Sequence, residues 1–300
     1  MWLSTVDRFK HADATGAVEL DGAALRKLQE VLAGMVADVD GVCRRNGITY
    51  TLGGGVALGA VRHRGFIPWD DDVDLNMPRA DYERFVPAFR REMGHKYWVH
   101  TPRETRGYGL ALMRIRLRGT CVITREDSRL PEEECGAFVD VFIIENTFDN
   151  AFLRFFHGVG SLALGFLYSC RKFFDERRLV SRMLVGGGRP LAFRVKTGIG
   201  MLVSFMSLDA WTSLWDRWNS LCGNNRSRWV TIPVGRRHFF VETGLRSDMC
   251  ETVPGSFEGM ELPLPSGVDG YLRRLYGADY MIPPPADMRE KHVFLQPFRL

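Results

Sequence analysis

Two short motifs of glycine and aspartate contain residue types that can bind phosphate and a metal ion. Gly54-Gly55 lies between a strand-like and a helix-like segment, and Asp72 and Asp74 follow with Val73 between them. Successive side chains of a strand point to opposite faces, so Asp72 and Asp74 would share one face. Adjacent carboxylates repel each other unless a cation lies between them, and oxygen ligands suit Mg²⁺ or Mn²⁺. A glycine turn before a helix allows close approach of a phosphate, so the pattern indicates metal-assisted phosphoryl or nucleotidyl transfer.

A third carboxylate, Asp140, lies inside the apolar segment 138–144. A buried carboxylate is costly unless it has a cation or a hydrogen-bonded partner. Two explanations fit this position. Asp140 is either a third metal ligand or general base beside the first two aspartates, or the partner of an arginine such as Arg114 or Arg116.

The elements that would position these residues alternate between helix and strand in the first half of the chain. Apolar residues spaced by three and four predict a helix over 21–46. Short apolar or alternating segments predict strands at 48–52, 72–75, 97–100, 110–118 and 138–144, and helices at 56–61 and 79–93. The predicted fold class is α/β (α+β), a mixed sheet flanked by helices.

Charge is unevenly distributed along the 300 residues. The net charge is only +4, which gives no reason to expect a nucleic-acid partner, and 45% hydrophobic content is typical of a globular chain. Residues 151–237 hold 14 basic and 4 acidic residues, while the remainder holds 26 basic and 32 acidic residues. This basic, apolar segment predicts helices that either contact an anionic membrane surface or only cover the core.

The cysteines and the N-terminus favour a reducing compartment. The six cysteines are widely scattered without a CxxC motif, which indicates reduced thiols rather than a zinc site. Residues 1–16 lack the apolar core of a leader peptide. The charge-free stretch 155–170 is shorter than the roughly 18–20 residues that cross a bilayer. We expect a cytoplasmic protein. If 151–237 contacts a membrane rather than only covering the core, the contact would be peripheral and at the inner membrane surface.

The run YTLGGGVALGAVRHRGFIPWDDDVD, residues 50–74, resembles the signature of the LicD family. These are phosphotransferases of the nucleotidyltransferase-fold superfamily, with fukutin and fukutin-related protein as distant relatives. The resemblance continues at other segments, namely 77–85, 114–116 with Thr120, 138–142, 257–259, 271–272, 275–277 and 283–284. It implies a nucleotidyltransferase-like core over 1–150, a basic apolar helical insertion over 151–225, and a C-terminal part over 226–300 that packs back on the core.

The resemblance also implies roles for individual residues. A divalent metal, Mg²⁺ or Mn²⁺, would be held by three catalytic aspartates, namely Asp72, Asp74 and Asp140. Nucleotide and phosphate groups would contact Gly54, Gly55, Arg62, His63 and Arg114. For Arg62 and His63 an alternative remains open, because these side chains could simply brace the loop.

The reaction typical of this family moves phosphocholine, or a related phospho-alcohol, from a CDP-activated donor to a hydroxyl of a cell-surface glycan. Such acceptors include lipopolysaccharide, teichoic acid and capsule, in free or lipid-linked form. Two other hypotheses remain. One is a nucleotidyltransferase that adds a nucleotide from a nucleoside triphosphate to a small hydroxylated acceptor. The other is a catalytically silent relative that binds a glycan or a membrane.

Overall fold

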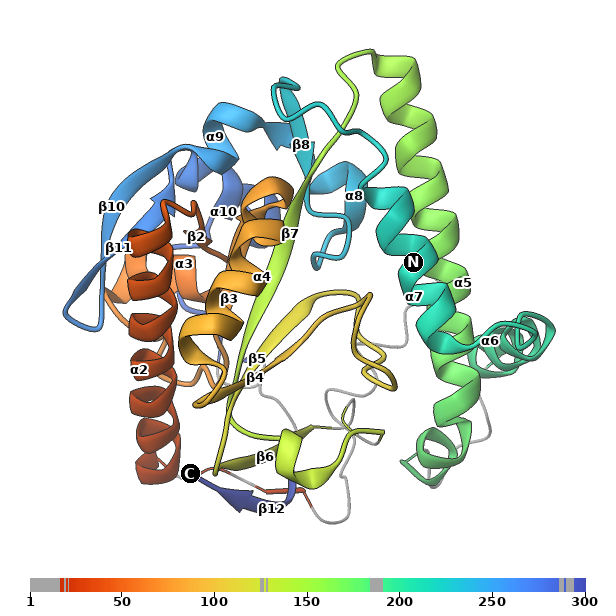
Figure 1. The fold of residues 1–300 in the computed structure, drawn as a ribbon, viewed down its shortest axis with the longest axis horizontal. Coiled ribbons are helices and arrows are strands. Elements are labelled where there is room, and N and C mark those ends of the chain that lie inside the picture. Colours follow the sequence, from red (N-terminus) through yellow and green to blue (C-terminus); the bar gives the residue numbers. More distant parts are fainter. Residues whose placement is uncertain are drawn as a thin grey trace.

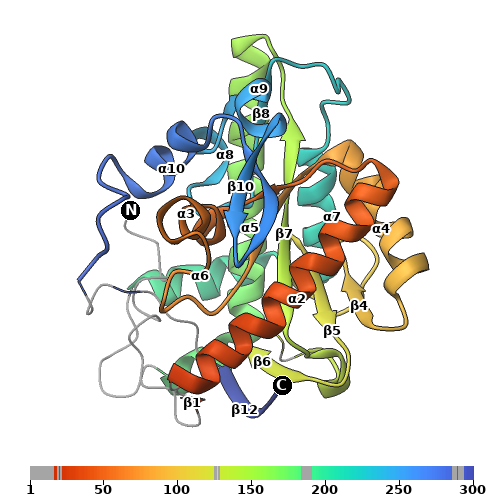
Figure 2. The same cartoon turned by 90° about the vertical axis from the view of Figure 1, so that its left-hand side faces the viewer.

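The computed structural model describes residues 17–18, 20, 22–124, 127, 129–183, 191–285, 289 and 294–300. The segment 1–16, on which the expectation about a leader peptide depends, lies outside these residues. Figures 1 and 2 show a central mixed sheet with helices on both sides. The predicted fold class is therefore confirmed.

The central sheet has the strand order β2-β3-β7-β5-β4, and β8 pairs with both β7 and β9. Its strands are β2 (Thr51–Leu52), β3 (Asp74–Pro78), β4 (Tyr97–His100), β5 (Met113–Leu117), β7 (Phe138–Asn146), β8 (Trp229–Thr231) and β9 (Gly244–Leu245). Only β3 and β7 pair in parallel; their register sets Asp74 beside Asp140. The antiparallel pairing of β7 with β5 sets Asp140 beside Arg114. The sheet thus aligns three charged residues that are far apart in sequence.

Two helices, α2 (Gly22–Asn46) and α4 (Arg79–Met93), pack on the sheet and bury its apolar face. The predicted stripe of α2 is buried, including Leu28, Leu32 and Val39. Burial alternates over 72–75 as predicted, because Val73 and Leu75 are fully buried while Asp72 and Asp74 are half-buried. The strand itself begins only at Asp74, however, and its later residues are all buried. The alternation leaves the aspartates on the face away from this core.

The C-terminal segments return to the same core. The hairpin of β10 (Thr252–Phe257) and β11 (Met260–Pro265) and the helix α10 (Val268–Tyr276) contribute Phe257, Leu262 and Leu272 to it. Helix α10 contacts α3 (Gly54–His63), the helix that begins at the glycine turn. Two short helices, α8 (His238–Val241) and α9 (Arg246–Cys250), precede the hairpin. A separate small sheet joins β1 (Ala17–Val18), β12 (Phe294–Arg299) and β6 (Cys121–Thr124), and a 3₁₀ turn, η2, spans Glu132–Glu134.

The segment after β7 forms three helices, as its composition predicts. They are α5 (Ala151–Met183), α6 (Leu191–Leu202) and α7 (Leu208–Asn219). A second hydrophobic cluster, built from Tyr168, Leu208, Trp211 and Trp215, lies between α5 and α7. In Figure 1 these helices form one edge of the molecule, opposite the edge that carries α2 and the β10–β11 hairpin.

Candidate functional site

The glycine turn opens α3 and leaves no room for side chains. Gly54 has a φ of +43°, in the left-handed region that favours glycine. A Cβ atom on Gly54 would lie 2.7 Å from Asp74 Oδ2, and one on Gly55 would lie 2.7 Å from Asp70 Oδ2. Because both positions are glycine, two carboxylates approach the N-terminus of α3 closely. A helix N-terminus favours negative charge, so it stabilises these carboxylates and would also favour a phosphate.

Three consecutive aspartates beside this turn form a compact set of oxygen ligands. One carboxylate oxygen each from Asp70, Asp71 and Asp72 lies within 4.8 Å of the others, and Asp71 is buried. Carboxylate oxygens at this spacing fit a hard divalent cation such as Mg²⁺. The structure therefore groups Asp72 with Asp70 and Asp71, whereas the sequence prediction paired Asp72 with Asp74.

Asp140 is held by an arginine, the second of the two explanations drawn from sequence. Arg114 donates two hydrogen bonds to this carboxylate, from Nε to Oδ1 at 2.6 Å and from Nη2 to Oδ2 at 2.7 Å. The Arg114 guanidinium also lies 3.8 Å from the centre of the Phe138 ring. Burial opposes the charged form of Arg114, but Asp140 outweighs this effect and raises the pKa of Arg114. An ionised carboxylate can accept about four hydrogen bonds, so the two from Arg114 use half of the acceptor positions of Asp140. The role of Asp140 as a third metal ligand remains a prediction.

Arg62 and His63 lie at the C-terminal end of α3, where Arg62 Nε donates to His63 Nε2 at 2.9 Å. Arg62 Nη1 also donates to the carbonyl oxygen of Tyr280 at 2.9 Å. Burial and the charge of Arg62 lower the pKa of His63, so this ring is neutral and accepts. Burial lowers the pKa of Arg62, which Tyr276 and Asp70 partly raise again. These hydrogen bonds hold the Arg62 side chain in place, as expected if it stabilises the loop. Its positive charge still interacts with Asp70 of the aspartate cluster.

Two tyrosines of α10 complete the site. Gly54 N donates to Tyr271 Oη at 3.0 Å, and Asn76 Nδ2 donates to the same oxygen at 3.2 Å. Burial raises the pKa of Tyr276 far above its usual value, and the charges of Asp74 and Asp70 raise it further. Tyr276 therefore stays protonated next to the carboxylates. Its hydroxyl is a neutral donor at a site where negative charge collects.

Sequence reasoning did not select Asp70, Tyr271 or Tyr276 as site residues. Asp70 belongs to the acidic run, but strand alternation favoured only Asp72 and Asp74. The two tyrosines lie in segments that carry the family resemblance, which assigned them no role. Tyr271 is 217 residues away from Gly54, and no local spacing links the two.

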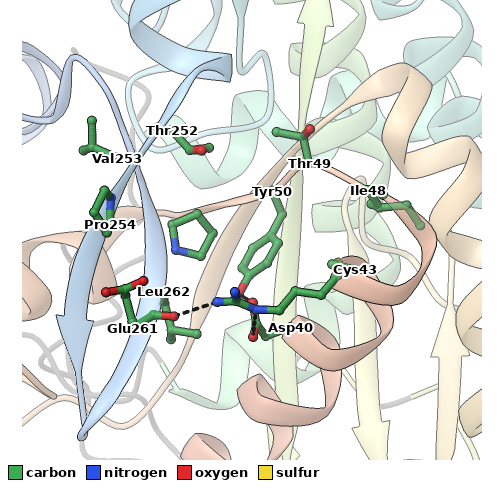
Figure 3. Close-up of a pocket in the computed structure, with 13 residues that line it drawn as sticks. Asp40, Cys43, Ile48, Thr49, Tyr50, Thr252, Val253, Pro254, Glu261 and Leu262 are labelled. Atoms are coloured by element: carbon green, nitrogen blue, oxygen red, sulfur yellow. Dashed lines mark hydrogen bonds and ion pairs between the residues drawn. The ribbon is translucent and has the colours of Figure 1, made fainter.

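A separate surface pocket of about 560 Å³ lies between the end of α2 and the β10–β11 hairpin (Figure 3). Tyr50 Oη donates to Asp40 Oδ1 at 2.9 Å on its wall, and Arg44 Nη2 donates to the carbonyl oxygen of Glu261 at 2.8 Å. The described residues that line this pocket include no predicted site residue. The pocket is therefore distinct from the aspartate and glycine cluster.

The arrangement of the glycine turn and the aspartates by itself indicates a class of protein. A glycine turn at a helix N-terminus, with carboxylates from the next strand segment facing it, is an arrangement suited to nucleotide or phosphate transfer. Residues 47–109, which include the turn and the acidic run, match the family model described as LicD/FKTN/FKRP, nucleotidyltransferase domain.

Individual proteins also match part of the chain. A stretch of 77 residues is 44% identical to the lipopolysaccharide cholinephosphotransferase LicD of Haemophilus influenzae, covering 26% of this chain and 29% of that protein. A stretch of 65 residues is 34% identical to an uncharacterized protein of Rickettsia typhi, covering 21% of each chain. The chain thus spans less than a third of the length of these relatives. The resemblance to the LicD family is confirmed, and residues 47–109 are the part of the chain that matches its nucleotidyltransferase domain.

Proposed function

We propose that the protein is a phosphotransferase for substituted phosphate groups, of the LicD type. It transfers phosphocholine, or a related phospho-alcohol, from a CDP-activated donor to a hydroxyl of a cell-surface glycan. The observation that carries this proposal is the approach of Asp70 and Asp74 to the Gly54-Gly55 turn. The 44% identity to a lipopolysaccharide cholinephosphotransferase over 77 residues supports the donor and acceptor classes.

A divalent cation, Mg²⁺ or Mn²⁺, belongs to the proposal. Asp70, Asp71 and Asp72 would hold it, because their oxygens already lie within 4.8 Å of one another. Asp74 and Asp140 are paired on the neighbouring strands β3 and β7 and would be further oxygen ligands. When bound, the cation supplies positive charge that stabilises the phosphate oxygens during transfer.

The chain's own residues would bind and orient the two substrates. The first backbone N–H groups of α3 face the donor phosphates, although Gly54 N–H already donates to Tyr271. Arg62 supplies positive charge from the far end of α3. The acceptor hydroxyl attacks the phosphorus that carries the alcohol, the bond to the CMP oxygen breaks, and CMP leaves. A carboxylate of the site accepts the hydroxyl proton.

The experiment is a binding panel with a product assay. The purified protein and its Asp72→Asn variant are titrated with CDP-choline, CDP-glycerol, CDP-ribitol, CTP and ATP, each with Mg²⁺ or Mn²⁺. We expect metal-dependent preference for one CDP-alcohol in the unmodified protein and release of CMP when a glycan acceptor is added. The exposed Asp279→Asn serves as a matched control, because it makes the same change outside the cluster.

Two outcomes would overturn the proposal. Preference for a nucleoside triphosphate with release of pyrophosphate would identify a nucleotidyltransferase instead. Absence of nucleotide and metal binding in a folded protein would identify a silent relative that keeps the fold.

A further inference from the structure

The outer side of α5 carries a row of large apolar side chains in solvent. Phe152, Phe155, Phe156, Val159 and Leu162 are exposed and recur at helical spacing, so they share one side of the helix. Phe152 alone is 68% exposed. A surface of this kind is larger than the scattered apolar residues of an ordinary surface and indicates an interaction site. We name this side of α5 the phenylalanine face.

The neighbouring helix adds to the exposed apolar surface. Leu191, Val195, Met201 and Leu202 of α6 are exposed, and Phe205 follows just after this helix. Both α5 and α6 lie along the same edge of the molecule (Figure 1). The apolar surface is therefore spread over two helices rather than confined to one groove.

The opposite side of α5 is fixed to the rest of the protein. His157 Nε2 lies 2.9 Å from the carbonyl oxygen of Trp218, and Ser161 Oγ donates to Asn219 Oδ1 at 2.6 Å. Gly160 and Gly165 let the rings of Trp218 and Trp215 pack against the helix backbone, because a Cβ at either glycine would lie less than 3 Å from the ring. These contacts hold the inner side of α5 on α7.

The contacts on the inner side of α5 indicate whether this helix crosses a membrane or lies on its surface. The stretch Ala151–Arg177 is long and apolar enough to cross a bilayer by length and composition alone, and only 22% of its most apolar window is buried. A crossing helix would need lipid or a membrane-embedded partner around its whole circumference. Because α5 hydrogen-bonds to α7 along its inner side, only its outer side is available to lipid. This geometry is that of a helix in the membrane interface.

The charge of the segment 151–237, which contains the phenylalanine face, fits an anionic surface. All four acidic side chains of 151–237 already have partners within the protein. Asp175 pairs with Arg171, Glu176 with Lys172 and Asp216 with Arg79, while Asp209 accepts from Gly107 N. Exposed arginines remain on the same helices, including Arg194 of α6 and Arg217 of α7. Anionic lipid headgroups attract such residues.

The phenylalanine face also contacts the segment around α8. Phe155 of α5 packs against Phe240 of α8, with ring centres 6.0 Å apart. Arg236, in the same segment as α8, lowers the pKa of Tyr276 and so acts on the site side of α10. The phenylalanine face is therefore in contact with this segment through the Phe155–Phe240 pair.

We propose that the phenylalanine face of α5, with the exposed apolar residues of α6, docks on the surface of an anionic phospholipid bilayer. The phenylalanine rings enter the interface, and the arginines of α6 and α7 contact the headgroups. The inference does not depend on the proposed function, because no site residue takes part in the docking.

The experiment is co-sedimentation with two kinds of vesicle, phosphatidylcholine alone and an equal mixture with phosphatidylglycerol. We expect stronger retention on the mixed vesicles. Phe152→Glu should lower affinity for them about tenfold or more, because it removes an exposed phenylalanine that would enter the bilayer interface and adds a negative charge. Arg217→Glu should lower it about fivefold or more.

Matched controls make these changes elsewhere. Ile282 is 69% exposed and lies outside α5 and α6, and Arg91 lies exposed on α4, so Ile282→Glu and Arg91→Glu should bind like the unmodified protein. Equal retention on both kinds of vesicle would overturn the proposal. So would a concentration-dependent dimer without vesicles that Phe152→Glu dissociates, because a second copy would then cover the face. Asp72→Asn should bind vesicles normally, which separates docking from catalysis.

Discussion

The carboxylates of Asp70 and Asp74 both lie close to the Gly54-Gly55 turn. Single substitutions in this acidic cluster should therefore affect activity. Asp72→Asn and Asp74→Asn each remove a negative charge from the cluster. We expect each variant to keep its fold and to fall below about 1% of the unmodified turnover, since charge stabilisation in such sites is worth a hundredfold or more. Turnover with a CDP-alcohol and circular dichroism are the measurements. Activity near that of the unmodified protein in either variant would contradict the metal assignment.

A second prediction at the residue scale concerns Gly55, where the lack of a side chain lets Asp70 approach the turn. Gly55→Ala places a methyl group 2.7 Å from Asp70 Oδ2, so the carboxylate must move. Since a small misplacement of a reacting group costs about a hundredfold in rate, we expect a comparable loss of turnover. Gly34→Ala is the control, because Gly34 is exposed in the middle of α2 with nothing within 4 Å of its Cβ position. This control should stabilise the protein by about 0.5–1 kcal/mol and keep its activity.

At the residue scale, sequence reasoning succeeded where the relevant geometry is local. The alternation of Asp72, Val73 and Asp74 follows from the period of a strand, and the structure buries Val73 between two half-buried aspartates. The partner of Asp140 was left between a metal and an arginine, because both stabilise a buried carboxylate. Only the antiparallel register of β5 and β7 places Arg114 opposite Asp140.

At the scale of elements, a buried ionic group joins α4, β7 and α7. Arg79 donates to Glu145, with Nε at 3.0 Å from Oε2, and to Asp216, with Nη2 at 2.7 Å from Oδ1. Arg79→Ala leaves two buried carboxylates without this partner, so it should lower the free energy of unfolding by about 3–5 kcal/mol. Arg84→Ala removes an exposed pair with Asp81 on the same helix and should cost less than about 1 kcal/mol. Urea denaturation of both variants is the measurement, and equal costs would contradict the prediction.

The link between α10 and α3 provides another prediction at this scale. Tyr271→Phe removes the oxygen that accepts from Gly54 N and Asn76 Nδ2. We expect a loss of about 1–3 kcal/mol in stability, because two donors lose their acceptor, together with weaker donor binding. Tyr50→Phe removes a comparable hydrogen bond to Asp40 in the separate pocket and should leave donor binding unchanged. Calorimetric titration with the preferred CDP-alcohol distinguishes the two variants.

The sequence predicted the elements themselves well, including the helix at 79–93 and the strand at 97–100, which the structure has with the same bounds. Periodicity and turn residues are local, so they locate elements along the chain. Strand order and register are not local. The parallel pairing of β3 with β7, which sets Asp74 beside Asp140, depends on packing of the whole sheet.

For the whole molecule, we expect stability to depend on pH through one buried carboxyl group. Burial raises the pKa of Glu242 from 4.5 to about 7, although Arg237 N–H donates to it. Folded Glu242 keeps a proton that the unfolded chain releases between these two values. The free energy of unfolding should therefore fall as the pH rises from about 5 to about 8, by up to about 3 kcal/mol.

Comparison with Glu242→Gln isolates this contribution, because glutamine does not titrate. Urea denaturation of both proteins across the same pH range gives the difference. Glu133→Gln, an exposed change in η2, should follow the pH dependence of the unmodified protein. A Glu242→Gln variant with an unchanged slope would place the titrating group elsewhere.

The hydrogen bond from Gly54 to Tyr271 also sets an order of events during synthesis. A ribosome that has made the acidic run and the central strand β7 has not yet made the helix that supplies the tyrosine oxygen. Until α10 emerges, the N–H of Gly54 lacks this acceptor, and the phosphate-facing turn is incomplete. The hydrogen bond that joins the glycine turn to Tyr271 can thus form only after α10 has been made, later than the strands β2, β3 and β7. Prematurely terminated chains would therefore hold an acidic cluster without the turn geometry needed to use a donor.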